Sequence, residues 1–298
     1  MAQSGKDKRE NYKGYALNME VFQKPTLQGS VVIRRVWKSN VEAEFKLIRN
    51  IITSYPVIAM DTEFPGLVIR SDSNFRDRNE SENYALLKAN VDRLHLIQVG
   101  LTLSDKDGNL PNLGTSHSFI WEFNLSDFDV SRDLHAPESI ALLRRQGIDF
   151  EMNTKFGIDS IHFRRLLLSS RILGRGDQVS WVTFHSAYDF GFLVKILTRR
   201  PLPQDLAAFL HIVRVFFGEL VFDVKYVMKF CSDLYGGLDR ISQTLRVDRV
   251  VGNSHQAGSD SLLTLHAFHK IIQLYFDHDN VDQLINFAGV LYDLEANY

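Results

Sequence analysis

Two acidic residues at the end of a short apolar run are the first place where the sequence could support chemistry. Residues 56–60 (PVIAM) form a short apolar run, which predicts a buried strand, and Asp61 and Glu63 follow directly. Because the two acids are two positions apart, an extended chain directs both side chains to the same side. Carboxylates held so close repel each other, and a divalent cation such as Mg²⁺ or Mn²⁺ relieves this repulsion through oxygen ligands. A strand end with two solvated acids is the ordinary alternative for this pair alone.

A possible catalytic group is completed by three residues from distant, later parts of the chain. Asp189 lies where an apolar strand pattern at 179–184 gives way to a helical pattern, and Asp260 lies beside the apolar face of a late helix. His255 is five residues before Asp260, about one and a half helical turns away or on the loop that enters the helix. In two-metal phosphodiester hydrolysis, acids hold two ions about 3.5–4 Å apart while a neutral histidine takes a proton from the attacking water. Four carboxylates and an imidazole match that requirement.

Each of these residues also has an ordinary interpretation when it is taken singly. Asp189 could cap the start of a helix, and Asp260 could pair with a buried arginine or lysine. His255 could be a satisfied surface histidine. The joint pattern favours the catalytic interpretation, because chance does not readily bring all five residue types together in this order.

Composition excludes several other classes of protein. The chain has 298 residues, a net charge of −2 and a single cysteine, Cys231, so neither a disulfide framework nor a cysteine-held zinc site is expected. No apolar stretch approaches the roughly 20 residues of a membrane span, and the polar N-terminus does not resemble a signal peptide. We therefore expect an intracellular protein without a membrane segment. It would comprise a flexible tail at 1–30, a single domain at 31–291 and a C-terminal tail at 292–298.

The elements that must position the acids follow from the hydrophobic pattern. We expect strands at 31–37, 56–60, 94–101, 117–124, 179–184 and 221–223. We expect helices at 40–53 with Asn40 as its cap, and at 83–90, 137–147, 159–168, 190–197, 204–217, 224–231, 238–247 and 257–275. The second to fourth strands should form an antiparallel meander, the first an edge strand, and the fifth a central strand. These elements predict an α/β domain with a mixed sheet flanked by helices.

The order of the acids and the histidine resembles the DEDD exonuclease superfamily in its histidine-bearing branch. Longer blocks are similar to one family within it, the CAF-one/POP-two deadenylases, which are catalytic subunits of the CCR-four–NOT complex. The blocks are MDTEFPG at 60–66, NVDRL at 90–94, TFHS at 183–186, YDFG at 188–191, YVMK at 226–229 and HQAGSDSLLT at 255–264. The similarity extends from about Glu20 to about Leu291, and the loops at 74–90 and 104–115 resemble those of plant members.

This resemblance implies an RNase H-like fold and removal of poly(A) from messenger RNA in the 3′-to-5′ direction, with release of 5′-AMP. It implies two Mg²⁺ (or Mn²⁺) ions held by Asp61, Glu63, Asp189 and Asp260, with His255 as the general base. The implied partners are poly(A) RNA, the NOT scaffold subunit and the CCR-type deadenylase, and the implied location is the cytoplasm, including mRNA-decay foci, and the nucleus.

Two positions depart from the family pattern. Ala187 stands where a glycine is expected, and the ending at 291–295 (LYDLE) also lacks an expected glycine. No catalytic position is replaced, so we expect an active enzyme. A non-catalytic docking subunit of the same complex, or a DEDD exonuclease with another nucleic-acid substrate, are the alternative functions.

Substrate contacts are expected beside the acids. Phe64 and Pro65 could pack against the terminal base or sugar, since base stacking contributes about 1–3 kcal/mol, although Phe64 could equally belong to the core. His185, Ser186 and Tyr188 flank Asp189 and could bond a phosphate or a 2′-hydroxyl, or simply form a polar turn. Because the chain carries no net positive charge, its affinity for RNA alone should be modest and salt-sensitive.

Overall fold

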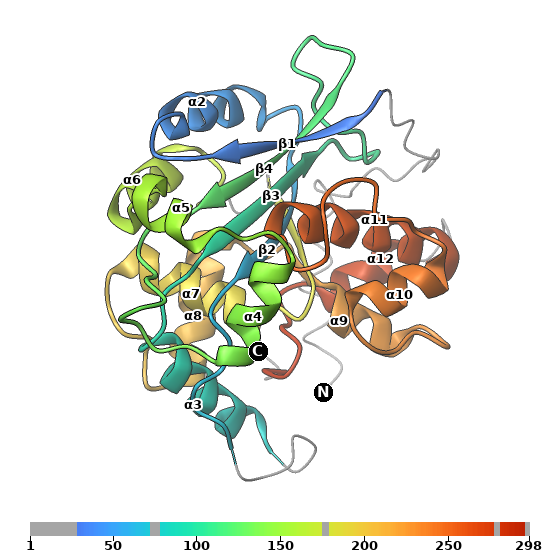
Figure 1. Cartoon of the computed structure of the whole chain (residues 1–298). Helices are drawn as coiled ribbons and strands as arrows, with labels where there is room; N and C mark the ends of the chain where they lie inside the picture. The colour runs from blue at the N-terminus through green and yellow to red at the C-terminus, as the bar shows by residue number, and fades with distance from the viewer. Residues whose placement is uncertain (1–28, 72–77, 175–178, 277–280, 296–298) are drawn as a thin grey trace.

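A six-stranded mixed sheet flanked by helices on both faces forms the body of the molecule (Figure 1). The structure is a computed structural model that describes residues 29–71, 78–174, 179–276 and 281–295. The predicted α/β class is therefore confirmed. The expected tail at 1–30 lies almost wholly outside the described residues.

The strands include the predicted meander and the predicted edge strand. They are β1 Val31–Val36, β2 Val57–Glu63, β3 Gln98–Ser104, β4 Ser118–Asn124, β5 Ser180–Thr183 and β6 Val221–Asp223, arranged β1-β4-β3-β2-β5-β6. β2, β3 and β4 form the antiparallel meander, and β1, β5 and β6 join it in parallel. β1 is an edge strand as predicted. β5 is an interior strand next to the edge strand β6, so the centre of the sheet belongs to β2 and β3.

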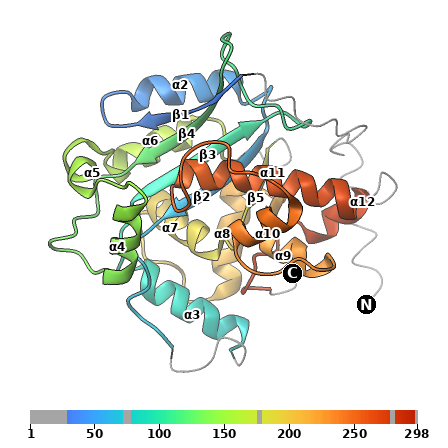
Figure 2. The same ribbon diagram turned by 45° about the vertical axis from the view of Figure 1, so that its right-hand side comes forward.

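Helices cover the two faces as separate layers. They are α2 Val41–Ile51, α3 Glu80–Val91, α4 Pro137–Arg145, α5 Phe150–Phe156, α6 Ser160–Ser169, α7 Ala187–Thr198, α8 Leu206–Phe217, α9 Val224–Val227, α10 Leu238–Leu245, α11 Ala257–Tyr275 and α12 Val281–Leu284, with short 3₁₀ turns at Met228–Phe230 and Ile285–Phe287. α11 crosses one face with α10 and α12 beside it (Figure 2), and its buried side chains pack with β2 and β5. α2, α3, α6, α7 and α8 pack on the other face around the larger apolar core.

Three boundaries differ from the sequence prediction for physical reasons. The strand expected at 94–101 begins only at Gln98, because the carbonyls of Asp92 and Leu94 accept hydrogen bonds from Lys195 Nζ (3.2 and 2.8 Å) instead of pairing in a ladder. Asn40 does not cap α2 through its side chain, which accepts the Trp37 N–H at 2.7 Å. α7 begins at Ala187 rather than at residue 190, so Asp189 lies inside its first turn.

Among the described residues, no helix has the length and the apolar composition that crossing a bilayer requires.

Candidate active site

The end of β2 brings Asp61 and Glu63 to the edge of the sheet beneath α11. Asp61 pairs with Gly100 on β3, and a Cβ at Gly100 would lie 1.9 Å from the carbonyl oxygen of Ala257. Only a glycine at this position lets the first turn of α11 touch the sheet. Asp260 lies in that first turn, and a bond between Thr102 and Ser261 (2.8 Å between hydroxyl oxygens) fixes the contact. A glycine on one strand thus brings acids from two distant segments together.

Glu63, His255 and Asp260 form the most compact part of the site. Each offers a possible ligand atom, and these atoms all lie within 4.8 Å of one another. Both carboxylates are buried, and the backbone N–H of His255 donates to Asp260 Oδ2 at 2.8 Å. His255 lies on the loop before α11 with a left-handed backbone (φ 58°), which resolves its expected placement in favour of the loop. The imidazole is therefore held beside two predicted metal ligands.

Asp61 and Asp189 lie outside this compact group but act on it through their charge. Burial, followed by repulsion from Asp260, Asp189 and Glu63, raises the pKa of Asp61 well above its ordinary value. Burial raises the pKa of Asp189 to about 7, although its Oδ1 accepts a hydrogen bond from the Thr62 hydroxyl. All four acids therefore lie close enough at one end of the sheet to oppose each other's ionisation.

The donor chemistry of this group fits a hard divalent cation. Burial, and then repulsion from Asp260, Asp189 and Glu122, raises the pKa of Glu63 well above its ordinary value. A bound cation removes the cost of such crowded carboxylates, and their oxygens are the donors that Mg²⁺ and Mn²⁺ prefer. The residues present therefore fit the predicted metals.

Arg249 is a participant that the sequence did not single out. Its Nη1 lies 2.6 Å from Asp260 Oδ1 and 2.6 Å from Ser259 Oγ, and its Nη2 bonds Asp239 Oδ1 at 2.7 Å. The pairing of Asp260 with a buried cation, considered above as an alternative, is thus present together with the acid cluster. One arginine balances one of the four carboxylates and fixes the loop that carries His255.

The aromatic residues next to the acids form a stacked pair. The ring of Phe64 lies parallel to Tyr188, with centroids 5.5 Å apart and planes 17° apart, and it also contacts Phe192 at 5.1 Å. Phe64 packs against the main core but is only partly buried, so part of its ring remains exposed at the edge of the site. Pro65 is buried, and its carbonyl accepts the Ala136 N–H at 2.8 Å, which fixes the chain beyond Glu63.

The turn before α7 is built around a second residue that sequence reasoning missed, Asp223. Its buried carboxylate accepts the backbone N–H groups of His185 (2.8 Å) and Ser186 (3.1 Å). Ser186 is fully buried, and its hydroxyl bonds Thr183 at 2.6 Å, so the expected bond to substrate is replaced by one inside the turn. The signal for Asp223 was its place at the end of a strand parallel to the one before Asp189.

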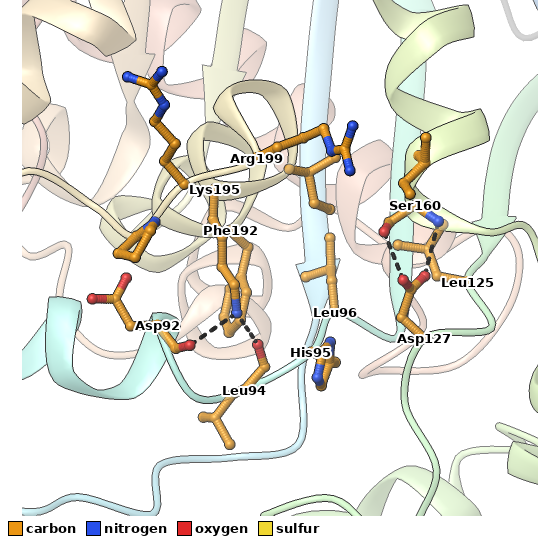
Figure 3. A pocket seen from close by; sticks show the side chains of 14 residues that line it. Asp92, Leu94, His95, Leu96, Leu125, Asp127, Ser160, Phe192, Lys195 and Arg199 are labelled. Carbon is orange, nitrogen blue, oxygen red and sulfur yellow. Dashed lines mark hydrogen bonds between the residues drawn. The ribbon is translucent and has the colours of Figure 1, made fainter.

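A cavity of about 300 Å³ lies near the C-terminal half of α7 (Figure 3). Two of its charged side chains bond within the fold: Lys195 Nζ donates to the carbonyls of Asp92 and Leu94 (3.2 and 2.8 Å), and Asp127 accepts from the hydroxyl of Ser160 (2.6 Å). None of the predicted catalytic residues lines it. The predicted catalytic residues therefore lie at the sheet edge and not at this cavity.

Comparison with known sequences identifies a single family. Residues 36–165 match the CAF1 family ribonuclease domain. The chain is 49% identical over 267 residues to the probable CCR4-associated factor 1 homolog 10 of Arabidopsis thaliana, covering 90% of this chain and 94% of that protein. It is 42% identical over 254 residues to the poly(A) ribonuclease pop2 of Schizosaccharomyces pombe, covering 85% of this chain and 73% of that protein.

Solved structures show the same relationship in three dimensions. S. pombe Pop2p, in a form with Mg²⁺ and Mn²⁺ bound, superposes with a TM-score of 0.79 at 40% identity and covers 88% of this chain and 99% of that one. The yeast CAF1 crystallised with the NOT1 MIF4G domain gives 0.69 at 31% identity, covering 91% and 99%. Exonuclease I gives 0.50 at 12% identity, covering 78% and 42%, which shows the fold alone.

Proposed function

Because this chain belongs to the CAF1 family of ribonucleases, we propose that it is an active deadenylase that shortens the poly(A) tails of messenger RNA. The enzyme would remove nucleotides from the 3′ end and release 5′-AMP. The observation that carries this proposal is the complete set of four acids and a histidine at one end of the sheet, in a chain 42% identical to a poly(A) ribonuclease.

The proposed mechanism assigns each group a role at the scissile phosphate. Asp61, Glu63, Asp189 and Asp260 would hold two Mg²⁺ (or Mn²⁺) ions, which supply positive charge to the phosphate and acidify the attacking water. A ring nitrogen of His255 would accept the proton of that water, because the imidazole lies beside Glu63 and Asp260. Arg249 would keep the Asp260 carboxylate and the His255 loop in position.

Substrate contacts are proposed for the residues beside the acids. The exposed part of the Phe64–Tyr188 pair would receive the terminal base, since any base can stack on an aromatic face. Pro65 would shape the wall of this position, and His185 would contact a phosphate. Ser186 would act only by holding the turn that presents His185 and Asp189.

We further propose that the chain acts within the CCR-four–NOT complex, bound to the NOT scaffold and a CCR-type deadenylase, in the cytoplasm, its mRNA-decay foci and the nucleus. The 31% identity with a CAF1 crystallised with the NOT1 MIF4G domain supports the scaffold contact. The net charge of −2 supports delivery by partners, because no overall positive field attracts RNA.

Digestion of matched oligo(A), oligo(U) and oligo(dA) with Mg²⁺ tests the substrate. We expect rapid loss of oligo(A), 5′-AMP as the product by chromatography, and slow loss of the other two. Equal rates on all three would favour the broader exonuclease, and absence of hydrolysis with retained RNA binding would favour the docking subunit. Asp61→Asn serves as the inactive control for contaminating nucleases.

A further inference from the structure

The C-terminal segment at residues 291–295 is packed against the turn that precedes α7, although the sequence assigned most of it to a tail. Leu291 and Leu294 are buried in the main core, 1% and 2% exposed. The Tyr292 N–H donates to Asp223 Oδ2 at 3.1 Å, the same carboxylate that holds His185 and Ser186. The segment is therefore part of the wall beside the proposed active site.

Asp293 adopts a backbone conformation that favours glycine. Its φ is 72°, in the left-handed region, and it lies in the ending at 291–295 that lacks an expected glycine. Aspartate tolerates this region better than most residues. Its Oδ2 lies 2.5 Å from His185 Nε2, and its carbonyl accepts Asn83 Nδ2 at 3.1 Å. The carboxylate therefore gains a partner that glycine would not have.

Glu295 makes a matching contact two residues later. Both of its carboxylate oxygens accept from Lys229 Nζ, at 2.7 and 2.8 Å. The two acids border a cavity of about 210 Å³ whose lining also includes Arg78, Asn83 and Tyr292. Acceptor oxygens at such distances from an imidazole and an ammonium occupy the positions that phosphate oxygens take at basic sites.

Asp293, which lines this cavity, bonds His185, and His185 lies three residues before Tyr188 of the aromatic pair proposed to receive the terminal base. Burial, and to a lesser extent the charge of Asp293, raises the pKa of Tyr188 to about 12, while Arg78 acts in the opposite direction. The charges of Asp293 and Arg78 both act on the ring that stacks on Phe64. An RNA strand whose terminal base stacks on the Phe64–Tyr188 pair would direct its next phosphates toward the C-terminal segment at 291–295.

We propose that His185, Lys229 and Asn83 form a binding subsite for a backbone phosphate of the RNA strand, and that Asp293 and Glu295 occupy this subsite until the strand displaces them. The proposal rests on the proposed function, since it places the subsite on the path of the same substrate. Proteins that bind single strands use a positively charged groove along the backbone. In a chain with a net charge of −2, that groove must be a local one.

The variant Asp293→Asn/Glu295→Gln tests this occupancy with little change in shape, because asparagine also tolerates the left-handed backbone. We expect tighter binding of RNA at low salt, by roughly two- to fivefold for each carboxylate removed, as expected for exposed ion pairs. The dependence of log Kd on log salt should steepen by about 0.7 for each phosphate that gains a cation. Lys229→Gln alone should weaken the binding of RNA. Combined with Asp293→Asn/Glu295→Gln, it should remove part of the increase in affinity that this double variant produces.

Fluorescence anisotropy with 5′-fluorescein oligo(A) gives the Kd and its salt dependence, with Ca²⁺ replacing Mg²⁺. The charge-matched control is Glu42→Gln/Glu151→Gln, which removes two exposed acids on α2 and α5, far from the segment in sequence. A double variant with the affinity and salt slope of this control would overturn the subsite. If wild type still shortens oligo(A) in that case, the proposed function stands and only the subsite is wrong. A wild-type protein that neither binds nor shortens oligo(A) would overturn both.

Discussion

At the scale of single residues, the site is a balance between buried negative charge and the groups that offset it. Thr62 donates to Asp189, the His255 backbone donates to Asp260, and Arg249 pairs with Asp260. None of these contacts reaches Asp61, whose pKa is raised by burial and by three neighbouring acids. The residues proposed for catalysis are therefore also sites of stored repulsion.

Replacing Asp61 separates the loss of function from the loss of fold. Asp61→Asn should abolish hydrolysis, because one ligand of the proposed metal pair is gone. In EDTA its melting temperature should equal or exceed that of wild type, since one repelling charge has been removed. Single-turnover kinetics and calorimetry measure the two effects. Retained turnover would show that Asp61 is not a metal ligand.

His255 is predicted to act on the proton of water. His255→Ala should slow hydrolysis by roughly 10²- to 10⁴-fold while Mg²⁺ still raises the melting temperature. A possible ligand atom of the imidazole lies within 4.8 Å of those of Glu63 and Asp260, so the thermal response also distinguishes a base from a ligand. If the response to Mg²⁺ disappears with the activity, His255 holds the metal.

Arg249 should matter most when no metal is present. The side chains of Arg249 and Asp260 are only 17% and 10% exposed, and removing one partner of a buried pair leaves an uncompensated charge. Arg249→Gln should therefore lower the free energy of unfolding in EDTA by about 3 kcal/mol. Mg²⁺ should restore more stability to the variant than to wild type. Arg132→Gln, which breaks an exposed pair with Asp129, is the control and should change stability little.

At the scale of elements, the approach of α11 to β3 assembles the site. The contact depends on Gly100, where a Cβ would meet the Ala257 carbonyl oxygen at 1.9 Å and the Gly258 nitrogen at 2.5 Å. Both are backbone atoms of the helix, so they cannot move without shifting Asp260. The geometry of two proposed ligands on β2 and one on α11 thus depends on a residue that carries no side chain.

Gly100→Ala should displace α11 and disable the site. We expect destabilisation of at least about 1–3 kcal/mol, as for overpacked cores, together with loss of hydrolysis. Gly237→Ala is the matched control, because a Cβ there meets no atom within 4 Å and the φ of Gly237 is negative. Denaturant unfolding of both variants checks the prediction. Equal stability and activity of the two would show that the helix does not depend on this contact.

The elements themselves were largely predictable from local sequence, whereas the contacts among them were not. The spacing of apolar residues along the chain predicts β2 and the antiparallel meander that it begins, because burial of a strand imposes that spacing. The hydrophobic pattern does not predict α5. It also predicts a start of β3 that is too early, because the carbonyl just before this strand is bonded by Lys195, which lies on a helix far along the chain. The sequence pattern predicts Asp61, Glu63, Asp189, His255 and Asp260 as site residues. It does not predict Arg249 and Asp223, since their role depends on tertiary position alone.

At the scale of the whole molecule, the acid cluster links stability to pH. The pKa of Asp189 is about 7 in the folded chain, against an ordinary aspartate value of about 3.9 when unfolded. The folded state therefore binds the proton more tightly, and the resulting stability is present below the unfolded pKa and lost as pH rises through about 7.

Thermal unfolding in EDTA between pH 5 and pH 8 measures this linkage. The melting temperature of wild type should fall relative to that of Asp189→Asn as pH rises through about 7, and Mg²⁺ should reduce the fall. Parallel curves for the two proteins would show that Asp189 is ionised throughout and that the carboxylates do not oppose one another.

A timed digestion of a 5′-labelled RNA that ends in an oligo(A) tail shows whether the acid cluster carries a metal-dependent deadenylase activity. Wild type and Asp61→Asn are compared in Mg²⁺ and in EDTA on denaturing gels. We expect a ladder that shortens from the 3′ end and pauses at the first non-adenosine residues, only with wild type and only with Mg²⁺. Shortening in EDTA, shortening by Asp61→Asn, or an intact RNA with wild type in Mg²⁺ would contradict it.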